Sequence, residues 1–367
     1  MKKLLLTFAL VFILVGGQVF SQTMEESMKN LGVEAGQKFV QPVVSGFGMN
    51  LNGGWFHKAP AAKIFGIDLE LGVVAMGTFT TEENKTFQLN GAFKFGGGPV
   101  GSNSEAEKLA KNINNYSLLP STQKQQIIDA IAAQTFNVSM QGPTVVGTKT
   151  DKLKITVPNT TLNVPGGVGN VTIPGVVQTI DEVTGVLDGS AIIPLVAPQA
   201  SIGTIYGTQA TFRYIPDIEI SKEFGKFKYF GFGIQHNLGM WLPIPVVDVG
   251  LSFFTQKLNI GTLMEAKTTA FGANVSKQLG FAFLNITPYA GFMLESSTMS
   301  FAYDFPTYQD PNNSANNKFE HVTFDLNGEN KSRITLGLGL RLLIININAD
   351  YNIGKQNSAT VGAFVAF

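Results

Sequence analysis

The stretch SRITLGLGLRLLIININADYNIG, residues 332–354, places an apolar residue at almost every second position. The two parities differ in residue type: Ile334, Leu336, Leu338, Leu340 and Leu342 lie on one, and Arg333, Thr335, Gly337, Gly339 and Arg341 on the other. After a short break the alternation resumes, with Asn346, Asn348, Asp350 and Asn352 on the polar parity. Because successive side chains of a strand point to opposite faces, this period of two predicts strands with one apolar and one polar face.

Two kinds of β-protein contain such strands. A soluble sandwich buries the apolar face and turns the polar face to water. A membrane barrel turns the apolar face to lipid and the polar face to its lumen. The alternation is compatible with both, so the rest of the chain has to decide between them.

The composition favours strands in a bilayer. Only 14% of the residues are charged, against roughly 25% in soluble domains, and the chain has 40 glycines and 29 phenylalanines. Lys+Arg and Asp+Glu are both 26; since a phosphate-binding face needs a basic excess, we do not expect a nucleic-acid partner. The absence of cysteine excludes disulfides and thiolate metal sites.

The N-terminus, MKKLLLTFALVFILVGGQVFSQ, has the features of a secretory signal peptide. Lys2 and Lys3 precede an apolar run from Leu4 to Val15, and the small residue Ser21 follows. The run has 12 residues, fewer than the ~20 that a spanning helix needs. We therefore predict a signal peptide over 1–21. No later apolar run approaches spanning length, so a membrane protein would have to be a closed barrel.

Residues 22–58 predict a short helical and looping segment, lumenal or periplasmic. Thr23 and Glu26 form a capping box and Gly32 ends the first short helix. A second helix is predicted over 33–40, ended by Pro42.

Residues 59–367 predict the barrel, interrupted by a segment of different character. Residues 96–194 contain only two aromatics, Tyr116 and Phe136. We expect this segment to be a plug in the lumen or an extracellular insertion. Candidate strands are 63–79, 86–95, 196–206, 208–220, 226–238, 246–260, 264–278, 282–303, 320–326, 331–343, 346–354 and 357–367.

Short separators alternate with longer loops among these candidates, as in outer-membrane barrels. The fold class predicted is therefore all-β: a closed antiparallel transmembrane barrel of about 12 to 14 strands, with a short N-terminal helical segment and a long insertion.

The polar parities supply candidate lumen-lining residues: Arg213, Asp217, Glu219, Gln235, Asn237, Arg333, Arg341, Asn346, Asn348 and Asp350. These side chains could pair with one another and fill the lumen, or line a polar pore. Four glycines share these inward positions: Gly231, Gly233, Gly337 and Gly339. Glycine relieves crowding where barrel strands coil, which we favour, or it leaves room for a plug or ligand. Trp55, Trp241 and Tyr351 are expected as interfacial anchors.

The C-terminus, SATVGAFVAF, aligns four residues on one face: Val361, Ala363, Val365 and Phe367. A final aromatic residue on such a face resembles the signal by which the Gram-negative barrel assembly machinery recognises outer-membrane barrels. The resemblance implies that machinery and outer-membrane lipid as partners, and the outer membrane as location.

Three stretches carry a family resemblance: 43–60 (VVSGFGMNLNGGWFHKAP), 212–220 (FRYIPDIEI) and 231–250 (GFGIQHNLGMWLPIPVVDVG). They resemble a family of Bacteroidota outer-membrane barrels known only as a domain of unknown function. The resemblance implies a barrel in the cell envelope and no particular reaction. The chain is more distantly similar to the long-chain fatty-acid transporter family, whose barrel holds its N-terminal segment as a hatch. The Asn-Pro-Ala motif of that hatch does not occur in this chain.

The three histidines do not predict a metal site. His57, His236 and His321 lie far apart without ligand spacing, so we expect surface or interface histidines. His236 could pair with Ser252 in a membrane hydrolase, but G-x-S-x-G is absent and no third partner is evident. We predict neither enzymatic activity nor a cofactor.

Three functions follow in order of preference. The first is passive transport of a small molecule of unknown identity, hydrophobic ones included. The second is a structural or adhesive filled barrel that presents residues 96–194 to a partner. The third is a membrane-embedded hydrolase.

Overall fold

The computed structural model describes residues 22–181, 183–221, 225–242, 244, 246–281, 283–308 and 318–367. The predicted signal peptide, 1–21, lies outside these residues. The chain divides into two compact units, which we call the barrel unit (41–81 and 190–367) and the insert unit (described from 22 to 40 and from 82 to 189). None of the described helices is long and apolar enough to cross a membrane.

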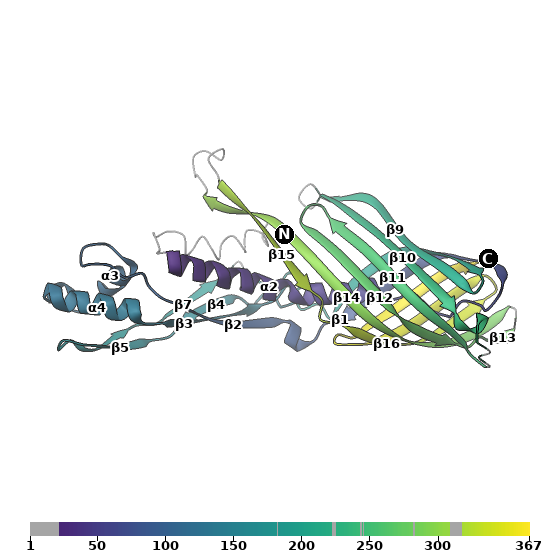
Figure 1. Cartoon of the computed structure of the whole chain (residues 1–367), viewed down its shortest axis with the longest axis horizontal. Helices are drawn as coiled ribbons and strands as arrows, with labels where there is room; N and C mark the ends of the chain where they lie inside the picture. The colour runs from purple at the N-terminus through teal and green to yellow at the C-terminus, as the bar shows by residue number, and fades with distance from the viewer. Residues whose placement is uncertain are drawn as a thin grey trace. The chain divides into compact units, whose positions relative to one another are not determined.

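The barrel unit is a closed ring of antiparallel strands (Figure 1). In ring order the strands are β1 (Phe65–Phe79), β8 (Ile192–Ile205), β9 (Thr208–Ser221), β10 (Gly225–Asn237), β11 (Asp248–Ile260), β12 (Met264–Ser276), β14 (Leu284–Tyr308), β16 (Ser332–Leu342), β17 (Ile345–Ile353) and β18 (Ser358–Ala366). Pairing of β18 with β1 and of β12 with β14 completes the ring. The predicted all-β closed antiparallel barrel is thus confirmed.

The predicted strand number was too high, because the ring formed by the described residues has ten strands. Of the twelve candidates, 86–95 belongs to a sheet of the insert unit. The candidate at 320–326 is β15 (Lys318–Asn327), which pairs only with the long end of β14. A third short strand, β13 (Leu279–Phe281), also pairs with β14 outside the ring. Alternation marks a strand but does not say which sheet it joins.

The stretch 332–354 forms β16 and β17, joined by a two-residue turn at Leu343 and Ile344. Its apolar parity faces outward, where Leu336 is 52% exposed, while Arg333 on the polar parity is 1% exposed. The same alternation recurs around the ring: outward Phe253 and Val361 are exposed, whereas inward polar residues such as Gln235 and Thr335 are buried, beside inward apolar ones such as Phe254.

The ring has two distinct ends. At what we call the turn end, Tyr206 and Gly207 connect β8 to β9, and Ala366 N donates to Ile344 O over 2.7 Å. At the loop end, Thr80 N donates to Ala191 O over 3.0 Å. The chain therefore leaves the barrel unit after Thr81 and re-enters it at Ser190 at the same end.

One helix, α2 (Gln22–Asn52), replaces the two short helices that were predicted. Gly32 and Pro42 both lie inside it. Proline removes one intrahelical hydrogen bond, but helices in proteins owe most of their stability to packing. Gly46 lies directly against Ile193 of β8, and Gly48 against Ser297 of β14. The wall thus stabilises a helix that local sequence would break.

The insert unit contains a four-stranded sheet, a hairpin and short helices. Its elements are η1 (Glu82–Asn84), β2 (Thr86–Phe93), α3 (Glu105–Ala110), η2 (Tyr116–Leu118), α4 (Ser121–Ala133), β3 (Phe136–Pro143), β4 (Leu153–Val157), β5 (Thr160–Val164), β6 (Gly169–Ile173) and β7 (Val176–Ile180). The sheet order is β2-β3-β4-β7, and β5 pairs with β6. The inserted stretch covers 82–189 rather than the predicted 96–194. At its start, β2 alternates like a barrel strand although it belongs to the insert unit. At its end, the barrel strand β8 already begins at Ile192.

The first half of α2 belongs to the core of the insert unit. Leu31 packs against Gly91 of β2, and Phe39 O accepts a hydrogen bond from Val145 N over 2.9 Å. Residues 22–40 therefore pack within the insert unit, whereas 22–58 had been predicted as one segment, lumenal or periplasmic.

A buried carboxylate orders the glycine-rich loop at 96–104 of the insert unit. Glu107 accepts hydrogen bonds from Gly101 N over 2.8 Å and from Asn103 N over 2.7 Å. These bonds to the ionised form, led by that of Gly101, hold the pKa of the Glu107 carboxyl below its usual range.

This loop should loosen in acid. A carboxyl whose pKa is depressed in the folded state stabilises that state above its unfolded pKa of about 4.3, and the contribution is lost as the pH falls through the folded pKa. We expect Glu107→Gln to increase amide exchange at Gly101 and Asn103 at neutral pH. Hydrogen-exchange mass spectrometry checks this, with Glu83→Gln on the exposed η1 as control. Equal exchange in both variants would contradict it.

Candidate functional site: the occupied barrel interior

Residues 41–60, which we call the plug, run through the ring from end to end. At the loop end, Gln41 Nε2 donates to Asn327 O over 3.0 Å. At the turn end, Ala59 N donates to Ser276 Oγ over 2.9 Å and Asn237 Nδ2 to Pro60 O over 2.5 Å. The plug therefore enters at the loop end and leaves at the turn end, where the chain continues into β1.

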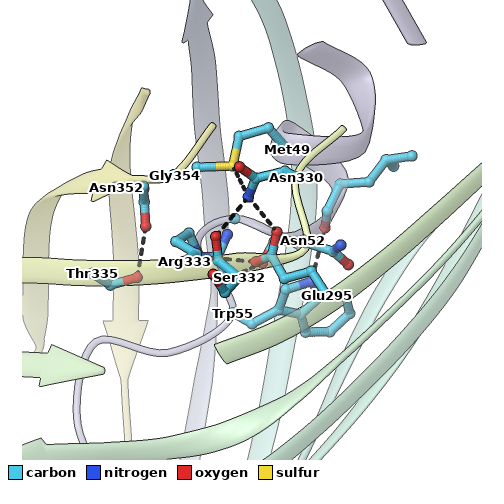
Figure 2. Close-up of polar contacts among 12 residues, drawn as sticks. Met49, Asn52, Trp55, Glu295, Asn330, Ser332, Arg333, Thr335, Asn352 and Gly354 are labelled. Carbon is cyan, nitrogen blue, oxygen red and sulfur yellow. Dashed lines mark hydrogen bonds and ion pairs between the residues drawn. The ribbon is translucent and has the colours of Figure 1, made fainter. Parts of the chain in front are cut away.

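Two buried arginines hold the C-terminal end of α2 inside the ring. The last carbonyls of a helix have no partner within it and carry the negative end of its dipole. Arg213 of β9 donates to Gly53 O over 2.9 Å and, through its other terminal nitrogen, to Leu51 O over 3.4 Å. Arg333 of β16 donates to Asn52 O over 2.6 Å (Figure 2). Both side chains are at most 1% exposed, so these are charge-assisted bonds shielded from water.

Arg213 is compensated by neutral partners. Its Nε donates to Gln199 Oε1 over 2.9 Å, and its guanidinium lies 4.1 Å from the centre of the Trp55 ring. Trp55 donates through Nε1 to Leu51 O over 2.9 Å and is 1% exposed. The prediction of Trp55 as an interfacial anchor was wrong, because a cation and a helix carbonyl inside the ring satisfy its ring face and its N–H.

Arg333 is compensated by an ion pair. Its Nε lies 3.1 Å from Glu295 Oε1 of β14. Figure 2 shows Asn330 beside this pair: its amide donates to Glu295 Oε2 over 2.9 Å and approaches Met49 Sδ at 3.1 Å. The pair is thus connected to the plug through Arg333 and through Asn330.

An aromatic cluster fixes the plug beyond the helix end. Trp55 stacks on Phe254 of β11 with centroids 5.1 Å apart, and Phe56 meets Tyr289 of β14 edge-on at 6.2 Å. Ala270 and Met293 complete the cluster. Aromatic pairs of this kind contribute roughly 0.5–1.5 kcal/mol beyond burial.

Glycines of the wall make room for these rings. A Cβ at Gly231 would lie 2.7 Å from Trp55, and one at Gly233 would lie 3.1 Å from the same ring. Gly337 likewise lies against Tyr289, whereas a Cβ at Gly339 would have nothing closer than 3.6 Å. Curvature had been the favoured explanation, but at Gly231 and Gly233 the structure supports room for the plug.

An ionic latch holds the plug near the turn end. Lys58 Nζ lies 2.7 Å from Glu70 Oε1 and 3.1 Å from Asp68 Oδ2, both on β1. His57 Nε2 lies 3.1 Å from Glu70 Oε2, and its ring stacks on Phe364. His57 was expected at a surface or an interface and is instead 7% exposed inside the ring, where a carboxylate partners it.

Polar residues of β17, two strands from β1 in the ring, line the neighbouring part of the wall. Asn346, Asn348, Asp350 and Asn352 are all buried on its inner face. Tyr289 OH donates to Asp350 Oδ2 over 3.0 Å, and Asn352 Nδ2 donates to Asp350 Oδ1 over 2.6 Å. The interior is thus crossed by hydrogen bonds between wall residues as well as by the plug.

The remaining candidate lining residues divide into two groups. Gln235 and Asn237 are buried inside, and Arg341 is half-buried with Nε donating to Leu343 O over 3.0 Å. Asp217 and Glu219 are exposed and were placed on the wrong face. A register shift opposite Phe227 and Tyr229 pairs Glu219 with the outward Lys226. A bulge of one residue exchanges the faces of the strand beyond it.

The hydrolase hypothesis loses its catalytic pair. Ser252 is buried inside, where Gln235 Nε2 donates to its Oγ over 3.2 Å. His236 lies on the outer face of β10, where Trp241 Nε1 donates to its Nε2 over 2.6 Å. His321 belongs to β15, and its side chain lies outside the described part of the chain. Within the described residues, no group of three or more His, Cys, Asp or Glu could hold a metal ion.

Several plug-holding residues escaped the sequence analysis: Glu70, Gln199, Glu295 and Asn330. Glu70 and Asp68 lie at alternate positions of an otherwise apolar strand, a signal that could have been read. Val361, Ala363 and Val365 of β18 are exposed on one face, and so is Phe367, which follows the strand. Tyr351 and Trp241 are also exposed.

A family model described as "Family of unknown function (DUF6588)" matches residues 1–367. No curated protein matches the chain. Among solved structures, it is similar to the loop L8 deletion mutant of OmpT, an outer membrane protein of Vibrio cholerae, with 9% identity over 82% of this chain and 98% of that one, and a TM-score of 0.23.

Two further solved structures are similar at the same level. A bacterial polysaccharide outer membrane secretin shares 7% identity over 82% and 98% of the two chains, with a TM-score of 0.23. Salmonella typhi OmpF in complex with daunomycin shares 9% over 82% and 97%, with a TM-score of 0.20. Similarity this low bears neither on fold nor on function, and the strand pairing itself defines the barrel.

Removing Arg333 should destabilise the barrel strongly. Arg333→Met leaves Glu295 buried without a cation, which typically costs about 3–5 kcal/mol. The double variant Arg333→Met/Glu295→Met should recover much of this loss, because no charge is then stranded. Denaturant unfolding in detergent micelles measures both, with Arg341→Met as the half-buried control. Equal losses for Arg333→Met and Arg341→Met would contradict the role of Arg333.

Filling the space beside Trp55 should displace it. In a Trp241→Phe background Trp55 is the only tryptophan, since the chain has two. We expect Gly231→Leu to shift its emission to the red as the ring moves from its packed site. Gly339→Ala, where there is room for a Cβ, should leave the spectrum unchanged. An unchanged spectrum in Gly231→Leu would show that the ring does not need this glycine.

Proposed function

The chain belongs to the DUF6588 family, whose function is unknown, and from its own barrel we propose that it is an outer-membrane pore, closed at rest by residues 41–60, that passes small polar solutes when this plug leaves. The observation that carries the proposal is a closed strand ring with a polar wall and a chain segment inside it. An origin in Bacteroidota stays a prediction.

The outer face supports insertion into a bilayer. Apolar residues about half exposed cover it, among them Val73, Val196, Phe271, Leu338 and Val361. An exposed apolar patch beyond a few hundred Å² marks a membrane or protein contact. Ile334 to Leu342 form a stretch of nine strand residues. If the strand is tilted by about 45° from the membrane normal, this stretch spans roughly 20 Å of the bilayer, close to the ~25 Å apolar band of outer-membrane barrels.

The wall chemistry indicates a polar solute. Gln199, Gln235, Asn348 and Thr335 would face the passage once the plug had left, together with the two arginines. Apolar wall residues such as Phe254 would be uncovered too, but Phe254 shares the inner face of β11 with the polar Ser252 and Gln256. The distant likeness to the fatty-acid transporter family therefore extends to an N-terminal segment inside a barrel, and we do not extend it to the substrate.

The C-terminus supports assembly in the outer membrane. Val361, Ala363 and Val365 lie exposed on β18, the strand that closes the ring with β1, and Phe367 lies exposed directly after it. We propose that the barrel assembly machinery recognises this strand. By the usual asymmetry of bacterial barrels the turn end would face the periplasm and the loop end the exterior.

A second function is favoured by the density of plug contacts. A barrel held shut at both ends could serve only to anchor the insert unit for a partner outside the cell. This structural function predicts no solute passage in any state of the plug.

Cysteine pairs can decide between the two functions, because the chain has no cysteine of its own. A Cβ built at Gly46 lies 3.5 Å from Ile193 Cβ, and one at Gly250 lies 3.4 Å from Ala59 Cβ. Both separations are near those of disulfides. The pairs Gly46→Cys/Ile193→Cys and Ala59→Cys/Gly250→Cys should therefore tie the plug to the wall.

We expect solute flux into liposomes through a variant lacking residues 41–58. In the full-length double-cysteine variants we expect rare openings, which oxidation of the pair abolishes and reduction restores. Single-cysteine variants are the controls. A deletion variant that folds as a barrel but gives no flux would refute the pore and favour the anchor.

A further inference from the structure

The turns at the turn end carry large apolar side chains. Those more than half exposed include Tyr206, Trp241, Phe281, Leu343, Ile344 and Phe367. These residues continue the apolar outer face beyond the last strand residues, so the apolar surface does not stop where the strands do. Turns that stand in water are normally polar.

The outer face is different toward the loop end. There Lys257, Glu265, Lys267, Thr269 and Ser296 line an open groove of about 560 Å³ on β11, β12 and β14. Glu265 lies 2.6 Å from both lysines. On these strands the outer residues thus change from Phe253 and Phe271 to charged and hydroxyl side chains, which places one limit of the apolar band on the wall itself.

The backbone shows that the apolar turn residues are kept at a cost. Tyr206, Val246 and Leu343 have φ of 47°, 82° and 54°, a region that favours glycine and asparagine. Turns at the loop end use glycine in the same region, at Gly225 and Gly261. Asparagine or glycine at position 343 would adopt this backbone conformation with less strain. The geometry of the turn therefore does not explain why the side chain there is apolar.

The indole N–H of Trp241 on this surface has a hydrogen-bond partner. Trp241 Nε1 donates to His236 Nε2, and His236 Nδ1 lies 3.0 Å from Thr208 Oγ1. With Nε2 accepting, the neutral ring carries its hydrogen on Nδ1 and donates it to Thr208. The indole can therefore leave water without an unpaired N–H.

We propose that the turn end is immersed in the bilayer, so that its turns lie among lipid headgroups and upper acyl chains instead of standing in water. Lipid is the partner because these side chains are continuous with the apolar outer face. Lys63 and Lys277 are nearby cations whose long stems can reach the headgroups. The inference rests on the membrane location proposed above. It also implies that the turn-end mouth of the barrel lies at the depth of the lipid headgroups.

Trp241 is a native probe of its own depth. Trp55→Phe leaves it as the only tryptophan, and quenching by lipids brominated near the headgroup or near the bilayer centre can be compared with quenching by aqueous acrylamide. In the background Trp55→Phe/Trp241→Phe, Phe253→Trp reports the middle of the apolar face and Ser300→Trp the polar groove. Should Trp55→Phe not fold, the difference between the intact protein and Trp241→Phe gives the same signal.

We expect Trp241 to be quenched severalfold more by shallow bromolipid than by deep bromolipid, and several times less by acrylamide than the tryptophan of Ser300→Trp. Strong acrylamide quenching without bromolipid quenching would overturn the proposal, provided that Phe253→Trp is quenched by bromolipid. Resistance to both quenchers would also overturn it, since a protein would then cover the turns. Absence of bromolipid quenching in Phe253→Trp would instead refute the membrane location itself.

Discussion

The barrel depends on the contact between two buried arginines and the end of a helix. Arg213 and Arg333 come from separate walls and donate to the carbonyls of three consecutive residues, Leu51, Asn52 and Gly53. A helix end without partners would be costly inside a protein, as would two guanidinium groups. Each requirement satisfies the other, so the plug is part of the interior's charge balance, and its departure would leave both arginines without these carbonyl partners.

The same contact explains why the walls have the residues they do. Gln199 and Glu295 orient the arginines, Trp55 covers the guanidinium of Arg213, and Gly231 and Gly233 leave the space that Trp55 needs. Together with the two arginines, these residues lie on five different strands and on the plug. These contacts form together only when the ring is closed. A pore closed by this plug would open only when a set of buried hydrogen bonds between plug and wall breaks.

The fold could be predicted from sequence where it depends on local periodicity. Arg333 and Asp350 were assigned to the inner face correctly because alternation is a property of the strand itself. Ring size was not, since β2 and β15 alternate like barrel strands while pairing elsewhere. The inner-face assignment of Asp217 and Glu219 was wrong because a bulge depends on the partner strand. The predictions for Trp55 and His57 were wrong because their partners inside the ring are distant in sequence. Two short helices were predicted in place of α2 because its packing overrides Gly32 and Pro42.

The passage of residues 41–60 through a hydrogen-bonded ring restricts how the molecule can be made. A completed ladder cannot admit a helix from the side. Either the pairing of β1 with β18 is formed around a segment already in place, or the free N-terminal end is drawn lengthwise through a finished cylinder. Because β18 is synthesised after the plug and after the other nine ring strands, the first route lets closure wait until the plug is in place, and the order of synthesis then protects against an empty, leaking ring.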